Sequence, residues 1–172
     1  DINRNHASQP MPALAPLKRS TQRMLTLVND MLEIHRLEEG ELVLQISCVP
    51  VRPFLEEIAS QYSSLIEEAR ISLLIEAPAD LPELMVDVEH TGRVLHNLLD
   101  NALKFTPDAG SISLIAQSEP TLNGNFVRLT VRDTGAGIPS VAQADLFHKY
   151  RQLEGAPGRR RGSGLGLYYC RL

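Results

Sequence analysis

The sequence predicts an α+β protein, a two-layer α/β sandwich preceded by a long amphipathic helix. Apolar residues recur every three or four positions between Leu17 and Leu37, which is the spacing of an amphipathic helix. Farther along, runs that alternate apolar and polar residues are typical of strands, and segments of helical periodicity lie between them. The resulting order of helix, strand, helix, strand, helix, strand, strand fits such a layered fold.

Length and composition limit the possible functions. A chain of 172 residues with 43% hydrophobic content can bury one compact core and carry an appendage. Its net charge of −4 argues against a nucleic-acid partner, because phosphate binding favours a clustered positive surface. No apolar run is long enough to span a bilayer, and Cys48 and Cys170 lack metal-ligand spacing. We therefore expect free thiols and a cytoplasmic location.

The first helix follows an irregular lead. Residues 1–16 contain three prolines and several small polar residues, which favour an extended segment. The helix is expected over 17–39 and should end at Gly40. Its apolar stripe can dock on its own domain or pair with a partner helix, and the pattern does not choose between them. The residues that form the stripe are Leu17, Met24, Leu27, Met31 and Ile34.

The remaining elements follow from periodicity and turn signals. A second helix is expected over 51–70, with Pro53 in its first turn, where proline is tolerated. Asp87 can cap a third helix, which should end at Thr106–Pro107. The segments expected to be strands are 41–47, 71–77, 111–118 and 126–133. The last two are separated by a turn that contains Asn123–Gly124, a pair that suits a hairpin.

Polar residues form a stripe along the third helix, in the stretch "HNLLDNALKFT" (96–106). Residues four and seven positions apart lie on one face of a helix, so Asn97, Asn101 and Lys104 share a stripe. Leucine and alanine occupy the neighbouring face. The helix should therefore bury one edge and present amides and an amine on another.

Two glycine-rich stretches follow. In "RDTGAGIP" (132–139), Asp133 ends a strand, and Gly135 and Gly137 allow a ligand to approach the backbone closely. A strand-end carboxylate can accept a hydrogen bond from an exocyclic amine, although a plain turn with a solvated aspartate is the alternative. In "RRRGSGLGLYY" (159–169), alternating glycines precede a short helix, and exposed N–H groups there can hold phosphate. A surface linker is the alternative for this second stretch.

Together the three stretches supply the contacts that a nucleoside triphosphate needs, and in this order they resemble a known family. The chain resembles the ATP-binding catalytic domain of sensor histidine kinases of two-component systems, within the ATPase superfamily that includes gyrase, the Hsp90 chaperones and MutL. The stretches correspond to its N, G1 and G2 boxes, and "DLFHKYRQL" (145–153) is similar to its F box, with Tyr150 where a second phenylalanine is usual. "LVNDMLEIHRLEEGELVLQ" (27–45) resembles the second helix of the dimerisation and phosphoacceptor hairpin and the following strand.

The resemblance implies a domain organisation. Residues 1–16 form the lead, and 17–39 form the second hairpin helix without the first. Residues 40–172 form an ATP-binding catalytic domain of the Bergerat type, truncated at its C-terminus.

The resemblance also implies site residues. Asn101 coordinates Mg2+, Asn97 holds a metal-bound water or the phosphate region, and Lys104 contacts phosphate. Phe105 lies along the adenine, and Asp133 accepts its amino group. Residues 138–164 form a lid, and Arg151 contacts the terminal phosphate. The remaining ATP-binding residues are Gly135, Gly137 and Ile138 near the base, and Gly162, Ser163, Gly164, Leu165 and Gly166 near the phosphates.

The implied activity is transfer of the γ-phosphoryl group of Mg2+-ATP to a histidine. That histidine lies on a helix of the same longer chain or of a dimer partner, and a response regulator receiver domain then takes the phosphoryl group. The full protein is expected to be a homodimer, and this piece to be cytosolic even if the whole sensor is membrane-associated. Hydrolysing relatives carry a glutamate base where Asn97 stands, and an amide cannot act as that base. The alternative is a truncated, non-catalytic nucleotide-binding or dimerisation module.

The acceptor histidine is not expected within this sequence. The family's acceptor stands in a block similar to His-Glu-Leu-Arg-Thr-Pro-Leu, and "HASQPMP" after His6 lacks the acidic neighbour and the proline register. His35 is expected to be an exposed or packing residue. His96, beside the metal asparagine position, is expected to be a structural group or to support the metal ligands from behind, and not to be a ligand itself, and His90 and His148 show no partner in the sequence.

Overall fold

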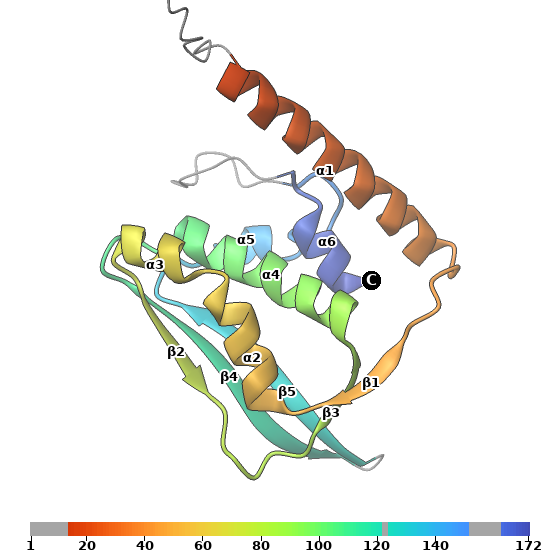
Figure 1. Cartoon of the computed structure of the whole chain (residues 1–172), viewed down its shortest axis with the longest axis vertical. Helices are drawn as coiled ribbons and strands as arrows, with labels where there is room; N and C mark the ends of the chain where they lie inside the picture. The colour runs from red at the N-terminus through yellow and green to blue at the C-terminus, as the bar shows by residue number, and fades with distance from the viewer. Residues whose placement is uncertain (1–13, 122–123, 152–162) are drawn as a thin grey trace, which may run out of the picture. The chain divides into compact units, whose positions relative to one another are not determined.

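A computed structural model describes residues 14–121, 124–151 and 163–172 (Figure 1). The chain forms two compact units, Asp1–Leu42 and Val43–Leu172. Among the helices of the described ranges, none is both long and apolar enough to cross a membrane.

The first unit is built on helix α1 (Leu14–Glu38), which ends at the predicted glycine. Gly40 has a φ of 69°, its N–H donates to the carbonyl of Leu37 (3.2 Å), and the N–H of Glu41 donates to the carbonyl of Arg36 (3.0 Å). These two bonds are the Schellman motif, which satisfies the last carbonyls of a helix. The large apolar side chains of α1 that are exposed are Leu17, Met24, Leu25, Leu27, Val28, Met31 and Leu32.

The second unit is a two-layer sandwich, as the sequence predicts. Its main sheet has the order β2 (Ser72–Glu76), β4 (Ser111–Thr121), β5 (Gly124–Asp133), with β2 parallel and β5 antiparallel to β4. Helices α2 (Val51–Ser60), α3 (Ser63–Ala69) and α4 (Val88–Phe105) lie on one side of this sheet (Figure 1). The remaining elements are the antiparallel pair β1 (Ile46–Val49) and β3 (Leu84–Asp87), and the short helices α5 (Ser140–Gln143) and α6 (Gly166–Arg171).

The core lies between the sheet and the helices. Alternate residues of β4 point into it, and Ile112 and Leu114 are almost fully buried. Leu95 and Leu99 of α4 lie one turn apart and are buried against the same core, at 3% and 1% exposure. This burial fixes which edge of α4 faces the sheet, and therefore which edge carries its polar stripe.

The predicted helix over 51–70 is wrong in one respect, because it is broken into α2 and α3. The hydroxyl of Ser60 donates to the carbonyl of Glu57 (2.7 Å), and that of Ser63 donates to the carbonyl of Ser60 (2.9 Å). Serine hydroxyls that take backbone carbonyls compete with the helical hydrogen bonds. Tyr62, between the two helices, turns inward and is only 6% exposed.

The predicted strand over 41–47 is also corrected, since pairing begins only at Ile46 and continues to Val49. Its partner β3 was not predicted, because a four-residue strand beside Pro82 gives too short a pattern. The other predicted strands correspond to β2, β4 and β5, and the hairpin pairs as far as Thr121 and Gly124. Asn123 of the predicted turn lies outside the described residues.

Asp87 caps α4, which confirms the prediction from sequence. One carboxylate oxygen accepts the N–H of His90 (3.0 Å), and the other accepts the N–H of Gln45 (2.7 Å). These backbone hydrogen bonds hold the pKa of the Asp87 carboxyl below its usual value. Asp87 thus joins the start of α4 to the segment that precedes β1.

We predict that Asp87→Asn lowers the midpoint of urea unfolding at pH 7 and that the difference from the wild type narrows in acid. Because the folded state favours the carboxylate, its contribution is complete above the unfolded pKa of about 3.9 and is lost as the pH falls through the lower folded pKa. Unfolding curves at pH 7, 5, 4 and 3 measure this. The exposed Asp80→Asn serves as the control, and a difference for Asp87→Asn that is constant with pH contradicts the charge argument.

Candidate functional site

The polar stripe of α4 is the centre of the site. Asn97, Asn101 and Lys104 are half-buried on the edge of the helix that the core does not use. The side-chain amides of Asn97 and Asn101 make no hydrogen bond with any residue in the described part of the chain. The Lys104 ammonium lies 4.7 Å from the ring centroid of Phe105, a cation–π contact. The stripe therefore offers two amide oxygens and a positive charge to a ligand.

Helix α6 lies against the N-terminal half of α4, which precedes this stripe. The hydroxyl of Tyr169 is 2.7 Å from Nδ1 of His90, and the Arg93 guanidinium lies 4.5 Å from the centroid of the Tyr169 ring. The Cys170 thiol donates to the carbonyl of Val94 (3.7 Å). Burial raises the pKa of Tyr169 and raises that of Cys170 to about 11, so both side chains stay neutral at pH 7. His90, without a partner in the sequence pattern, thus meets a tyrosine far along the chain.

The predicted glycines of the third stretch allow α6 and the F-box segment to approach. A Cβ on Gly166 would lie 2.8 Å from Oδ1 of Asn97, so only glycine fits there without moving the amide. Gly164 has a φ of 76°, and its carbonyl accepts the N–H of Tyr150 (2.9 Å). Leu165 is buried, and its N–H donates to the hydroxyl of Ser163 (3.3 Å). Gly162 lies outside the described residues.

The turn after β5 lies against the C-terminal end of α4. Oδ1 of Asp133 accepts the N–H of Gly135 (2.8 Å), and Asp133 is exposed. A Cβ on Gly135 would lie 2.8 Å from the carbonyl oxygen of Phe105, which shows how closely the turn and the helix approach. Gly137 has a φ of 71°, and Ile138 beside it is 43% exposed. The turn thus holds one carboxylate oxygen and leaves the other to a ligand.

The three stretches singled out in the sequence therefore meet around one helix. Asn97 contacts the glycine stretch at α6, and the last turn of α4 contacts the glycine turn after β5. Amide oxygens suit a hard dication, an ammonium suits phosphate, and a carboxylate suits a hydrogen-bond donor. The arrangement can hold a ligand that combines an anionic group with an amine.

Arg151 has a carboxylate partner that the sequence did not indicate. Its guanidinium lies 3.3 Å from Oδ2 of Asp145, and Nδ1 of His148 lies 3.3 Å from the other oxygen of the same group. Both pairs are exposed, so each contributes little to stability. Of the predicted lid over 138–164, residues 152–162 lie outside the described part of the structure, and the rest contains α5.

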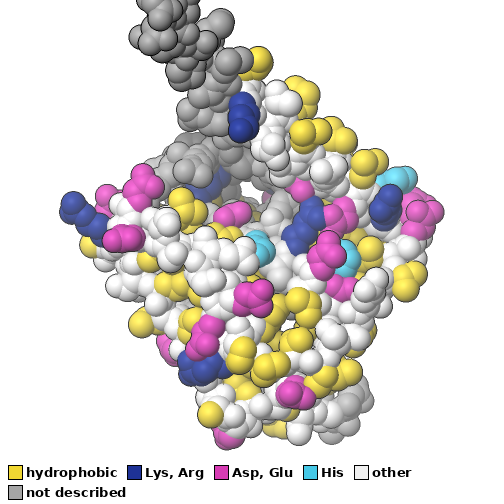
Figure 2. All heavy atoms as spheres, in the orientation of Figure 1, with side chains coloured by type: hydrophobic (Ala, Val, Ile, Leu, Met, Phe, Trp, Pro, Cys, Tyr) yellow, Lys and Arg dark blue, Asp and Glu magenta, His cyan; other side chains and the backbone are white. Residues whose placement is uncertain are grey.

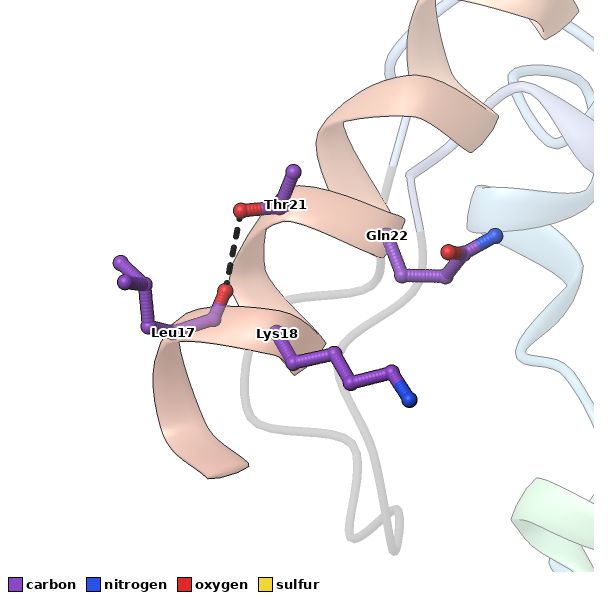
Figure 3. A pocket seen from close by; sticks show the side chains of 4 residues that line it. All are labelled: Leu17, Lys18, Thr21 and Gln22. Carbon is purple, nitrogen blue, oxygen red and sulfur yellow. Dashed lines mark hydrogen bonds between the residues drawn. The ribbon is translucent and has the colours of Figure 1, made fainter. Parts of the chain in front are cut away.

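Other surfaces of the described residues are weaker candidates for a ligand or metal site. A shallow pocket on the first turns of α1 is lined by Leu17, Lys18, Thr21 and Gln22, and Figure 3 shows Lys18 and Gln22 extending to one side of the helix and Leu17 to the other. The Thr21 hydroxyl there donates to the carbonyl of Leu17 (3.0 Å). Within the described residues, no three His, Cys, Asp or Glu side chains gather as a metal site. On the face drawn in Figure 2, Lys and Arg side chains are dispersed among Asp and Glu.

Comparison with known proteins identifies the family of this chain. A family model described as "Histidine kinase-, DNA gyrase B-, and HSP90-like ATPase" matches residues 86–172, a range that begins just before the Asp87 cap and includes all three stretches. Hybrid signal transduction histidine kinase D of Dictyostelium discoideum is 34% identical over 151 residues, which are 87% of this chain and 10% of that protein. Signal transduction histidine-protein kinase BarA of Escherichia coli K12 is 31% identical over 157 residues, 90% of this chain and 17% of BarA.

Solved structures share the fold. Full-length ShkA in complex with AMPPNP aligns with a TM-score of 0.78 and 30% identity, over 91% of this chain and 32% of that chain. Histidine kinase AdeS of Acinetobacter baumannii aligns with a TM-score of 0.72 over 96% of this chain and 74% of that chain, and at 20% identity it supports the fold alone. The chain spans only a small part of the two curated relatives named above. It belongs to the family of histidine kinase-, DNA gyrase B- and HSP90-like ATPases, and the relatives named above are histidine kinases.

Proposed function

We propose that this chain binds Mg2+-ATP and donates the γ-phosphoryl group to a histidine, as the catalytic part of a sensor histidine kinase. The observation that carries the proposal is the pair of half-buried amides, Asn97 and Asn101, which make no hydrogen bond within the described residues and lie on the helix that contacts both glycine stretches. Membership of an ATPase family and relatives named as histidine kinases support it. The related structure of ShkA contains AMPPNP, an ATP analogue.

The donor set of α4 fits Mg2+ together with phosphate. The ion prefers oxygen ligands in octahedral geometry and keeps several waters, so a neutral amide oxygen and phosphate oxygens suffice. Asn101 is the proposed direct ligand, and Asn97 holds a metal-bound water or a phosphate oxygen. When bound, Mg2+ neutralises the charge that develops on the phosphates. Lys104 adds its positive charge on the same edge of α4.

Adenine is proposed to lie at the turn after β5. Because Oδ1 of Asp133 already accepts the N–H of Gly135, the other carboxylate oxygen accepts the hydrogen bond from the exocyclic amine. Phe105 and the exposed Ile138 line the base, and Gly137 lets it approach the backbone.

The phosphates are proposed to lie along the third stretch. Backbone N–H groups near the start of α6 would hold the anion, and Gly164 and Gly166, with Gly162 outside the described residues, would line the phosphates. Arg151 exchanges the Asp145 carboxylate for the terminal phosphate, which is open to it because the existing pair is exposed and weak.

Transfer then depends on positioning. The acceptor histidine nitrogen attacks the γ-phosphorus in line, the bond to the bridging oxygen breaks, and ADP leaves. Asn97 supplies no base for water, so hydrolysis should be slow. We assign residues 17–39, which include all of α1 after its first three residues, to the second helix of the dimerisation hairpin and residues 40–172 to the catalytic domain, and we place both in the cytoplasm. The acceptor belongs to another helix of a longer chain or of a dimer partner, and a receiver domain takes the phosphoryl group from it.

We predict that this chain binds a non-hydrolysable ATP analogue at one site and that Mg2+ strengthens the binding. Asn101→Ala should weaken the Mg2+-dependent binding about tenfold, the effect expected of one lost polar ligand. Calorimetric titration with and without Mg2+ measures both. A folded wild-type chain that does not bind contradicts the proposal, and binding without transfer to an added acceptor hairpin supports a non-catalytic nucleotide-binding module instead.

We predict that Asp133→Asn changes which base the site prefers. With Oδ1 still accepting the Gly135 N–H, the substituted amide presents its NH2 group to the amine of adenine, and two donors repel. ATP binding should weaken at least tenfold, as for a lost charged hydrogen bond, whereas ITP, with an acceptor oxygen at that position, should lose much less. Competition titrations give the ratio of the two dissociation constants. Equal losses for both nucleotides contradict the assignment of Asp133.

We predict that Gly166→Ala weakens Mg2+-nucleotide binding about tenfold, because the new Cβ displaces the Asn97 amide, while stability changes little. Gly92→Ala on α4 is a matched control. Apart from the backbone of α4 itself and the adjacent residues, no atom of the described residues lies within 4 Å of a Cβ there, so the change should leave binding intact and stabilise the helix by up to about 1 kcal/mol. Titration and urea unfolding of both variants separate the effects, and wild-type affinity in Gly166→Ala counts against the role of Asn97.

A further inference from the structure

Tyr62 connects the break between α2 and α3 to the helix that carries the site. The side chain is 6% exposed, and its hydroxyl is 3.0 Å from Nδ1 of His96, 3.1 Å from Oδ1 of Asp100 and 3.3 Å from the carbonyl oxygen of His96. The rings of Tyr62 and His96 are also in contact, with centroids 5.6 Å apart. One buried hydroxyl thus binds two successive turns of α4.

The hydrogens of this cluster can be assigned by counting donors. The hydroxyl has one proton, and the Asp100 carboxylate is its strongest acceptor. The hydroxyl oxygen then accepts from His96, which places the histidine proton on Nδ1. Burial and the nearby Asp100 charge raise the pKa of Tyr62, so the hydroxyl remains protonated. The chain of bonds therefore runs from His96 through Tyr62 to Asp100.

The two partners of Tyr62 precede the two asparagines of the site. His96 is next to Asn97, and Asp100 is next to Asn101. Neighbouring residues of a helix are fixed at about 100° to each other, so a contact that fixes the rotation of α4 at His96 and Asp100 also fixes the direction of both amides. The Asn97 amide has little room to move, because Gly166 lies against it with no room for a Cβ.

We propose that Tyr62 is a positioning residue for the Mg2+-nucleotide site, acting through His96 and Asp100 on the orientation of Asn97 and Asn101. This inference rests on the proposed function and goes beyond it, because Tyr62 lies in the break between two other helices and acts only through α4. The break between α2 and α3 places Tyr62 where its hydroxyl contacts α4.

Tyr62→Phe removes the hydroxyl and keeps the ring, so it tests the inference. Titration with a non-hydrolysable ATP analogue should show binding with Mg2+ weakened about fivefold, as expected for lost hydrogen bonds, and binding without Mg2+ changed less than about twofold. The enhancement by Mg2+, which is the dissociation constant without Mg2+ divided by that with Mg2+, should therefore fall. Nitrogen-resolved NMR of the histidine rings should show the His96 proton leaving Nδ1 for Nε2, a change that general loosening does not produce.

Ile58→Val is the control for loss of stability. Ile58 lies on α2, the helix that precedes Tyr62, and is a core residue with 3% exposure. Its truncation therefore loosens α2 without touching the Tyr62–His96–Asp100 cluster. It should retain the wild-type enhancement by Mg2+. If Tyr62→Phe fails to fold, Asp100→Ala removes the exposed acceptor instead and must lower the enhancement too.

Three outcomes overturn the inference. If the wild type binds and Tyr62→Phe keeps the full enhancement, the positioning role is wrong while the proposed function stands. If Ile58→Val loses the enhancement equally, the effect belongs to stability. If the folded wild type binds no nucleotide, the proposed function is wrong and the positioning role falls with it.

Discussion

The burial of one edge of α4 is the constraint on which the rest of the site depends. Leu95 and Leu99 are almost fully buried against the sheet, and burying a leucine side chain contributes about 1.5 to 3 kcal/mol. Rotating α4 far enough to redirect Asn97 and Asn101 would expose these leucines to water. The hydrophobic core therefore decides which edge of α4 carries the polar stripe, and the glycine stretches and α6 are arranged around that edge.

The parts of the fold that the sequence predicts are those decided by local signals. The cap at Asp87, the end of α1 at Gly40 and the β4–β5 hairpin each depend on residues close together in the chain. The contact of Tyr62, in the break between α2 and α3, with His96 on α4 was not predicted, because the two residues are 34 positions apart in the chain. The contact of Tyr169 with His90 joins residues 79 positions apart, and no periodicity reports such a pair.

The glycines of the site have a second physical reason besides access for a ligand. In the sequence, Gly135 and Gly166 indicate close approach of a bound molecule. In the structure, each also lies where another part of the protein comes too near for a Cβ, at the Phe105 carbonyl and at the Asn97 amide. The same residues that let a ligand approach therefore let the turn and α6 pack against α4. A substitution there alters the assembly of the site before any ligand binds.

The identity of residue 97 follows from this packing as well as from chemistry. Asn97 is half-buried, and its Oδ1 lies beside the start of α6. A glutamate would bring a charge into this partly desolvated contact, and a charge there is costly unless a partner or a metal compensates it. A neutral amide avoids that cost and still offers an oxygen to a ligand. Under the proposed function, the residue that leaves the site without a base for water is thus also the one that tolerates the close contact with α6.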